Sequence, residues 1–240
     1  MKLQFYNSIT SQKEEFKPIS NNEVLVYGCG PTVYNAPHIG NFRTFVFYDL
    51  INRVLMQNGY TVRNVINITD IDDKIIDRIN NENVTFDDLT KKYERLFLDQ
   101  SALLNILPST INPRASEYIS DMIDFIKSLI EKGVAYEVNG NIFFDTKAYK
   151  KYGKFVNIDD ENLSTEDDEL GKKHPNDFAL WKAWKESDGE ITWKSDWGNG
   201  RPAWHTECAV LGTQLLGKSI DIHCGGIDLK FPHHENESAQ

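Results

Sequence analysis

A strand, a glycine-rich turn, a helix and a second strand follow one another near the start of the chain. Residues 23–27 form a short apolar run, typical of a buried strand, that leads into the turn Gly-Cys-Gly-Pro at 28–31. Apolar residues recur at helical spacing over 42–58, and Gly59 suits the position just past a helix end. The β-branched residues of 61–67 predict a second strand. This order indicates an α/β fold with a parallel sheet, whose ligands bind at the carboxyl ends of the strands.

The middle of the chain is expected to be more helical. A capping box that begins at Thr85 predicts a helix over 85–104, and apolar spacing predicts another over 119–130. Residues 134–145 predict a hairpin, because the Asn139–Gly140 pair at its centre favours a type I′ turn.

All five tryptophans lie between residues 181 and 204, and we interpret them as packing within a small inserted subdomain. After them the α/β pattern returns, with a helix expected over 206–216 and a strand over 219–223. A helical segment begins at His233 and reaches the last residue without a capping residue, so we expect the chain to be a fragment of a longer protein.

Composition narrows the classes of function. Acidic residues outnumber basic ones, 36 to 26, which argues against a surface coated for phosphate binding but not against a local nucleotide pocket. Residues 157–170 concentrate the acidity and are interpreted as a solvated surface loop. No apolar run has the length of a membrane helix, and the first residues lack the apolar core of a secretory signal. Three cysteines are too few, and odd in number, for a disulfide framework, so we expect a cytoplasmic location.

His38, Gly40 and Asn41 mark a candidate phosphate site between the glycine-rich turn and the first helix. A helix N-terminus offers unpaired N–H groups and the positive end of the helix dipole. Gly40 lets a ligand approach the backbone, and the other two side chains can donate hydrogen bonds to an oxyanion. A histidine at this position also serves as a helix cap or a packing residue, so the residues alone leave that alternative open.

Five stretches of the sequence resemble a known family. Residues 31–41 (PTVYNAPHIGN) resemble the "HIGH" signature of class I aminoacyl-tRNA synthetases. Four further stretches resemble cysteinyl-tRNA synthetases in particular: 27–34, 67–75, 200–208 and 231–237. Two residues depart from the family pattern: Asn41 replaces the usual second histidine of the signature, and Cys224 stands where glycine is common. Because asparagine still donates hydrogen bonds, the first departure predicts altered phosphate contacts rather than none.

A candidate metal site emerges from residues of three types. His233 and Glu237 are four apart, so a helix places them on one face. Cys29 stands in the glycine-rich turn at a strand end, and thiolate, imidazole and carboxylate groups all bind zinc. From the residues alone, buried and inert cysteines are an equal alternative. The resemblance implies that Cys29, Cys208, His233 and Glu237 hold one zinc ion per chain.

The resemblance also implies what the zinc does. A cysteine substrate offers the metal a thiolate, whereas serine offers a hydroxyl that ionises poorly, so one bond to zinc separates the two amino acids. Four protein ligands are typical of a closed structural site, so recognition requires a fifth ligand or a loosened one, and Glu237 is our candidate for the loosened ligand. Cys224 is a possible competitor for the metal, although its glycine-rich turn favours simple packing.

Further residues are assigned roles by the resemblance. Thr69, Trp204, His205 and Asp228 match positions that line the amino acid and adenylate pocket, with Trp204 core packing as the alternative reading. The expected ATP-binding residues are Gly30, His38, Gly40, Asn41 and His234, with His38 and Asn41 also catalytic. His234 is expected to point away from the metal face of its helix. An acidic helix start accounts for Asp70, Asp72 and Asp73 more simply than a magnesium cluster does.

The resemblance implies a Rossmann-like class I synthetase catalytic domain with a parallel sheet, interrupted by an inserted connective α+β subdomain. We expect its first half at 1–115, the insertion at 116–200 and the start of its second half at 201–240. The implied partners are L-cysteine, ATP with Mg²⁺ and tRNA(Cys), and we expect a monomer without membrane contact.

The implied reaction activates cysteine as cysteinyl adenylate and then passes it to tRNA. The family's lysine-rich "KMSKS" loop does not occur in these residues, so we expect this chain to bind zinc and cysteine but to form adenylate poorly. Two alternatives remain: the related ligase that joins cysteine to an amino sugar in mycothiol synthesis, and a truncated paralogue that binds zinc and cysteine without catalysis.

Overall fold

The computed structural model describes residues 2–153 and 170–240. The acidic segment 157–170 lies outside the described residues apart from Leu170, so its interpretation as a surface loop stays a prediction. None of the described helices combines the length and the apolarity needed to span a bilayer.

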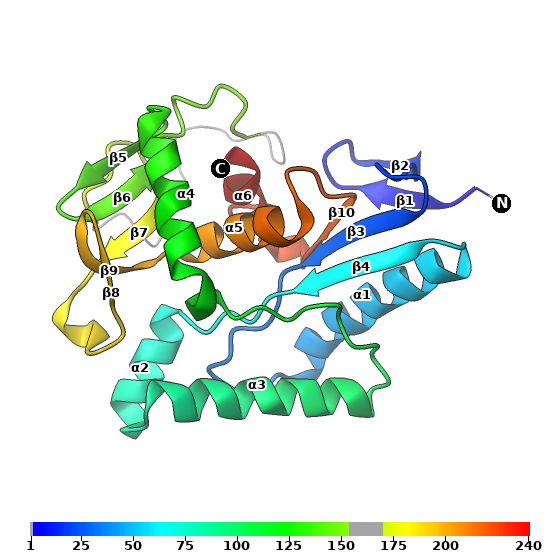
Figure 1. Ribbon diagram of the computed structural model, residues 1–240, viewed down its shortest axis with the longest axis horizontal. Helices are drawn as coiled ribbons and strands as arrows, with labels where there is room; N and C mark the ends of the chain where they lie inside the picture. Colours follow the sequence, from blue (N-terminus) through cyan, green and yellow to red (C-terminus); the bar gives the residue numbers. More distant parts are fainter. Residues whose placement is uncertain (1, 154–169) are drawn as a thin grey trace.

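A parallel sheet of three strands forms the centre of the fold (Figure 1). β3 (Glu23–Gly28) lies between β4 (Thr61–Ile66) and β10 (Ile222–Cys224) and runs parallel to both. Two isolated parallel bridges, Val65–Ile111 and Ile68–Arg114, continue the pairing beyond β4. The predicted parallel sheet is confirmed, and it joins strands from opposite ends of the sequence.

Alternate residues of β3 face two layers of helices. Val26 packs with α1 (Ile39–Gln57) and α3 (Phe86–Leu103), whereas Tyr27 packs with α5 (Trp204–Leu216). Figure 1 shows α1 and α3 on one side of the strands and α5 on the other. Because successive strand residues point to opposite faces, the apolar run of this strand is explained by helices on both sides.

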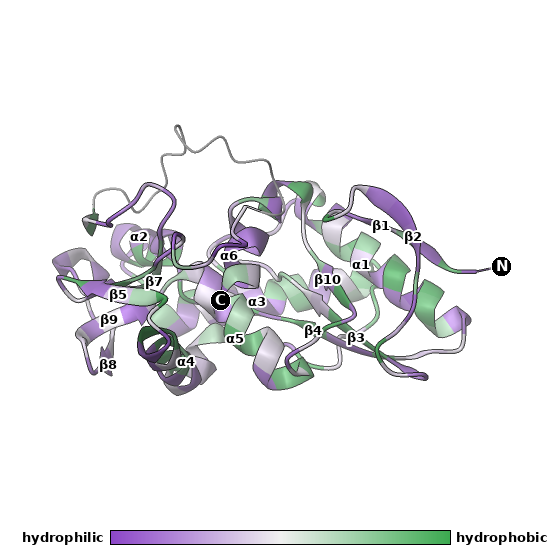
Figure 2. Ribbon diagram, turned by 90° about the horizontal axis from the view of Figure 1, so that it is seen from above, coloured by the Kyte–Doolittle hydropathy of each residue, from purple (hydrophilic) through white to green (hydrophobic). Residues whose placement is uncertain are grey.

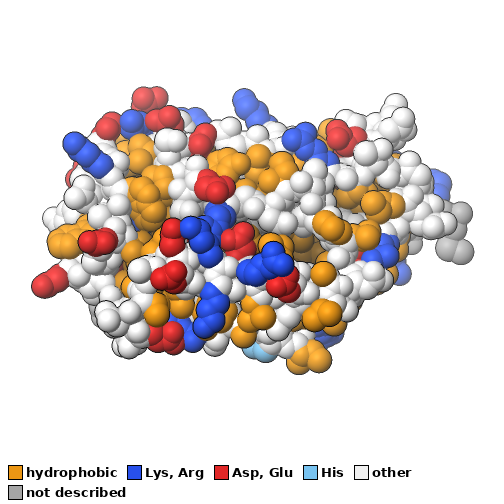
Figure 3. All heavy atoms as spheres, turned by 60° about the horizontal axis from the view of Figure 1, so that its bottom comes forward, with side chains coloured by type: hydrophobic (Ala, Val, Ile, Leu, Met, Phe, Trp, Pro, Cys, Tyr) orange, Lys and Arg blue, Asp and Glu red, His pale blue; other side chains and the backbone are white. Residues whose placement is uncertain are grey.

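The helix ends follow the expected local chemistry. Thr85 caps α3 by accepting a hydrogen bond from the Asp88 N–H at 3.1 Å, and Gly59 follows α1 with a φ of 89°. On the solvent side of α3, Lys91 and Arg95 pair with acidic residues one turn away. Figure 3 shows this side of the molecule, where acidic and basic side chains intermingle with apolar patches.

A second sheet is antiparallel and contains five strands. In spatial order these are β5 (Ala135–Val138), β6 (Asn141–Phe144), β7 (Phe178–Ala183), β9 (Gly198–Pro202) and β8 (Trp193–Ser195). The predicted hairpin is β5–β6, and Asn139 and Gly140 both have positive φ, as a type I′ turn requires. The apolar face of α4 (Ile119–Glu131) packs with this sheet, and Figure 2 shows hydrophobic and hydrophilic residues alternating along α4. The expected division at 115/116 and 200/201 stays a prediction.

One expectation needs correction. The strand predicted over 219–223 begins only at Ile222, because the Asp221 carboxylate instead accepts hydrogen bonds from the N–H groups of Ile19 and Leu25. The burial of the tryptophans also limits a second interpretation: Trp181 is fully buried, as packing requires, whereas Trp204, for which a pocket-lining role was also considered, begins α5 with 37% of its surface exposed.

The remaining elements are short. They are β1 (Gln4–Asn7), β2 (Gln12–Glu15), α2 (Asp73–Glu82), α6 (His233–Ala239) and the 3₁₀ turns η1 (Ala115–Tyr118), η3 (Glu186–Asp188) and η4 (Ile227–Lys230). β1 and β2 form an antiparallel hairpin, and α6 contacts α5 near the carboxyl end of the central sheet. The chain's last helix is thereby placed beside the turn that follows β3.

Candidate functional site

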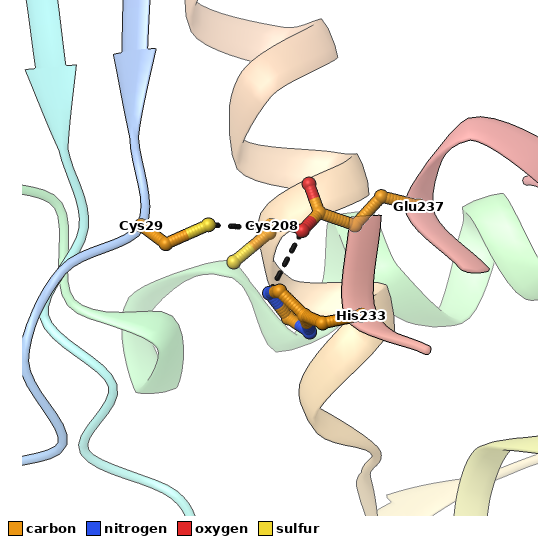
Figure 4. Close-up of side chains that lie close together, drawn as sticks. All are labelled: Cys29, Cys208, His233 and Glu237. Atoms are coloured by element: carbon orange, nitrogen blue, oxygen red, sulfur yellow. Dashed lines mark hydrogen bonds and ion pairs between the residues drawn. The ribbon is translucent and has the colours of Figure 1, made fainter. Parts of the chain in front are cut away.

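Four side chains from separate parts of the chain meet beyond the end of β3 (Figure 4). Cys29 directly follows β3, Cys208 lies in the second turn of α5, and His233 and Glu237 lie one turn apart on α6. Their possible ligand atoms all lie within 4.8 Å of one another. The structure therefore brings together the four residues that the sequence suggested as metal ligands.

The turn that carries Cys29 depends on the glycine after it. A Cβ added at Gly30 would lie 1.5 Å from the backbone oxygen of Asn67, so a larger residue cannot occupy this position without moving the backbone. The Gly30 N–H also donates to the Asn67 side-chain oxygen at 2.9 Å. The close approach of the Gly30 backbone to Asn67, together with this hydrogen bond, holds the turn against the end of β4. The turn directs the Cys29 thiol toward α5 and α6. The structure thus gives Gly30, expected to bind ATP, a role in positioning this turn.

The geometry of His233 suits a metal ligand. Its Nε2 lies 2.7 Å from Glu237 Oε1, yet makes no hydrogen bond to any described residue. A ring nitrogen and a carboxylate oxygen that lie this close without the angles of a hydrogen bond can both bind one cation placed between them. The other ring nitrogen, Nδ1, lies 2.7 Å from Nδ1 of His205. A hydrogen-bond partner on the second ring nitrogen fixes the orientation of a metal-binding histidine.

Two more histidines approach the same cluster. His223 Nε2 lies 3.1 Å from Glu237 Oε2, and His234 Nε2 lies 3.5 Å from Cys29 Sγ. The expectation that His234 points away from the metal face is wrong, because the chain before α6 brings its ring over Gly225 and toward Cys29. His223 was missed from the sequence, although its place at the end of a strand beside two glycines was an available signal.

The start of α1 shows how His38 acts as a cap. Its Nδ1 accepts hydrogen bonds from the N–H groups of Gly40 and Asn41, at 3.0 and 3.3 Å, and the Asn41 side chain accepts from the His38 N–H. With Nδ1 an acceptor, a neutral ring carries its proton on Nε2. The two backbone N–H groups expected to bind phosphate are already occupied, and exposed His38 keeps one outward donor.

The residues expected to line an amino acid pocket lie at different depths. Thr69 is buried, and its hydroxyl oxygen accepts a hydrogen bond from the Asn67 amide at 3.0 Å. Trp204 stacks on His233 with ring centroids 4.0 Å apart. His205 contacts His233 rather than open space, and Asp228 is exposed on η4. Their substrate-binding roles stay predictions.

Comparison with known proteins identifies the family. The family model described as "tRNA synthetases class I (C) catalytic domain" matches residues 15–240. The chain belongs to this family. Over 98% of its length it is 47% identical to a cysteine–tRNA ligase of Brachyspira hyodysenteriae, and over 99% it is 51% identical to one of Finegoldia magna. It covers 51% and 52% of those proteins, and thus spans about half the length of the curated relatives it matches.

Solved structures support the same fold at low sequence identity. A methionyl-tRNA synthetase of Mycobacterium tuberculosis in complex with methionyl-adenylate has a TM-score of 0.67 and 12% identity, over 91% of this chain and 55% of that one. A putative arginyl-tRNA synthetase of Campylobacter jejuni has a TM-score of 0.52 and 14% identity, over 93% and 52%. The expected Rossmann-like class I synthetase fold is therefore confirmed.

The electrostatics of the cluster formed by Cys29, Cys208, His233 and Glu237 centre on Glu237. Burial alone would raise its pKa, but the imidazoles of His223 and His233 hold the pKa of Glu237 well below its ordinary value. Interaction between the two neighbouring thiols lowers the pKa of Cys208 to about 6 and, together with burial, raises the pKa of Cys29 well above its ordinary value. Against the opposing effect of burial, Glu237 and Cys208 raise the pKa of His233 to about 10. Glu237 and Cys208 are therefore the members of the cluster whose pKa shifts favour the anionic form, and His233 is the one whose shift favours the cation.

Cys224 is not part of this cluster. It is buried in the apolar core between β3 and α1, and burial raises its pKa to about 12. Neither of the two possible metal-binding groups among the described residues contains it. The structure favours packing over competition for a metal.

The three aspartates near the start of α2 do not converge on one point. Asp70 accepts from the N–H and hydroxyl of Ser116, whereas Asp72 caps α2 by accepting from the Lys74 N–H. Asp73 instead pairs with cations of the second sheet: Lys182 at 3.2 Å and Arg201. The interpretation of Asp72 as part of an acidic helix start agrees with this geometry, and Asp73 links α2 to the second sheet.

Proposed function

We propose that the whole protein containing these residues is a cysteine–tRNA ligase, which activates L-cysteine with ATP and transfers it to tRNA(Cys). The observation that carries the proposal is the group formed by Cys29, Cys208, His233 and Glu237, which lies beyond the carboxyl end of β3. Ligands of such sheets bind at this end. Because the relatives are cysteine–tRNA ligases, the similarity favours tRNA as the acceptor over an amino sugar.

The donor set suits zinc. Two thiols, an imidazole and a carboxylate form a set that zinc binds tetrahedrally, and the unaligned His233–Glu237 pair leaves both groups available to one ion. When bound, zinc supplies a soft Lewis acid with a preference for sulfur over a neutral hydroxyl. Glu237 would be the ligand that loosens, because its second oxygen already has His223 as a partner at 3.1 Å.

Other residues supply binding and orientation. His38 Nε2 would donate to a phosphate oxygen of ATP at the positive end of α1, with the magnesium that accompanies ATP, while Asn41 holds the cap in shape. Thr69 and Asp228 would bind polar groups of the amino acid, and Trp204 would form a wall above His233. His205 holds the His233 ring, and His234 would act near Cys29 rather than at the nucleotide. A monomeric state and a cytoplasmic location remain part of this proposal.

Cysteine-dependent exchange of pyrophosphate into ATP, measured with the whole protein, tests the proposal. We expect exchange with L-cysteine and none above background with L-serine. Cys208→Ala should abolish the exchange, whereas Cys224→Ala, which removes a buried thiol outside the cluster, should leave it within about twofold. Equal exchange with serine, or full exchange in Cys208→Ala, would contradict the proposal.

A further inference from the structure

The loop that leads into α1 is tied to the rest of the protein mainly at its start. Val33 is buried and donates its N–H to the Thr69 carbonyl at 3.1 Å. Residues 34–37 come next and lead directly to His38, the cap of α1. Among the described residues, a single hydrogen bond joins residues 34–37 to a distant part of the chain. The position of the segment before His38 therefore depends strongly on that bond.

Arg78 of α2 supplies this hydrogen bond. Its Nη1 donates to the Tyr34 carbonyl oxygen at 2.9 Å, across 44 positions of sequence. We propose that Arg78 is a positioning residue, which fixes residues 34–37 and thereby sets the place and direction of the His38 imidazole. The effect on the loop stands on the geometry alone, whereas the effect on catalysis rests on the proposed function of His38.

The guanidinium of Arg78 is itself held in one orientation. Its Nε donates to Glu82 Oε1 at 2.8 Å, and its Cζ lies 5.1 Å from the centre of the buried Tyr93 ring. Because the guanidinium is planar and rigid, these two contacts also fix the direction in which Nη1 points. Lys74, one turn earlier on α2, has its Nζ 5.7 Å from the centre of the Tyr34 ring. One face of α2 is thus turned toward the loop.

α2 provides a firm base for this contact. Ile75 and Ile76 are buried, and Asp72 caps the start of the helix by accepting from a backbone N–H at 2.8 Å. Near the other end, the Asn80 side chain donates to the Ser187 carbonyl at 2.8 Å. The helix is therefore anchored through its buried face and at both ends. Removal of the guanidinium should release the loop while α2 itself stays in place.

The cap at His38 converts a shift of the loop into a shift of its outward donor. Its Nδ1 accepts from the N–H groups of Gly40 and Asn41, so the ring keeps its orientation only while the backbone at residue 38 stays over the start of α1. Displacement of a positioned group by about 1 Å can cost about 10²-fold in rate. Arg78 acts on the backbone four residues before His38 and can therefore influence the rate through the loop.

Hydrogen exchange of backbone amides in the whole protein tests the effect on the loop independently of activity. Arg78→Met keeps an unbranched apolar stem but removes every donor of the side chain. We expect the amides of Gly40 and Asn41, which donate to His38, to exchange about tenfold faster in this variant, with the amides of β3 unchanged. Arg95→Met, which removes an exposed ion pair on α3, is the matched control and should change neither. Unaltered exchange at Gly40 and Asn41 in Arg78→Met would overturn the inference.

Cysteine-dependent pyrophosphate exchange in the whole protein tests the effect on catalysis. Arg78→Met should lower kcat by about 10- to 100-fold and leave the KM for cysteine unchanged. Glu82→Gln, which retains an acceptor for Arg78 Nε, should leave kcat within about twofold.

A double variant shows whether Arg78 acts through His38. Once His38→Asn has removed the outward donor, Arg78→Met should lower kcat by less than about twofold further. An equal loss with and without the His38 imidazole would refute the positioning role. Absence of exchange in the unaltered protein would instead contradict the proposed function, and the amide exchange at Gly40 and Asn41 would then decide the role of Arg78 in the loop.

Discussion

His205 and His233 meet through their Nδ1 atoms, 2.7 Å apart, in the buried layer beneath Trp204. Burial first, and then the charge of His233, lower the pKa of His205, while Glu237 and Cys208 raise that of His233 despite its burial. The shared proton therefore resides on His233, whose Nδ1–H donates to His205. His233 Nε2 faces Glu237, and a metal that binds this nitrogen must displace the proton it carries there.

The first prediction concerns this histidine pair. His205→Phe removes the acceptor for His233 Nδ1–H while retaining a ring of similar shape, so the orientation of His233 becomes less defined. We expect zinc affinity to fall by about 10- to 100-fold, the usual effect of removing a partner of a metal-binding histidine. Competition with a chromophoric chelator measures this change. His174→Phe serves as the control, and affinity equal to that of the unaltered protein in both variants would contradict the role of His205.

The second prediction separates two glycines. Gly30→Ala places a Cβ against the Asn67 backbone oxygen, which no side-chain movement relieves, and should lower the free energy of unfolding by about 3 kcal/mol or more. Gly59→Ala meets no described atom within 4 Å but has a φ of 89°, so its cost should be about 1–2 kcal/mol. Urea unfolding of the metal-free protein compares the two. A smaller loss for Gly30→Ala would show that the turn adapts.

Local sequence patterns were sufficient for several elements but not for every strand or for every contact of the site. Thr85, Gly59 and the Asn139–Gly140 pair act within a few residues of themselves, so the sequence predicted the caps and the type I′ turn that the structure contains. The place of His223 beside Glu237 depends instead on β10 lying next to β3 and on α6 crossing beyond it. Spacing along a chain does not report such packing, and for this reason both His223 and the direction of His234 were missed.

The third prediction concerns Glu207, which is fully buried on α5. Neither carboxyl oxygen has a hydrogen-bond partner among the described residues, and burial raises the pKa of Glu207 well above its ordinary value. A raised pKa in the folded state means that its contribution to stability is fully present below about pH 4.5 and is lost as the pH rises through the folded value. Because Glu207→Gln is uncharged at every pH, its free energy of unfolding does not include this pH-dependent decrease.

The free energy of unfolding should therefore differ little between Glu207→Gln and the unaltered protein near pH 4.5. At pH 8 the variant should be more stable, with the difference increasing steadily between these values. Urea unfolding at several pH values, with chelator present throughout, measures the trend. Thr206→Ser, at the adjacent buried position, provides a control that does not titrate. A difference that is constant with pH would show that Glu207 does not remain protonated in the folded state.

The fourth prediction separates the two roles of His38. His38→Asn keeps a good helix cap, because asparagine also accepts from the N–H groups at the start of α1, so the free energy of unfolding should change by less than about 0.5 kcal/mol. The same variant lacks the outward Nε2–H, and removal of one such donor at a reacting charge typically costs about 10²- to 10³-fold in rate. His38→Ala should lose both the cap, about 1 kcal/mol, and the rate. Urea unfolding together with cysteine-dependent pyrophosphate exchange in the whole protein tests both parts. If exchange in His38→Asn equals that of the unaltered protein while His38→Ala is unstable, the histidine serves only as a cap.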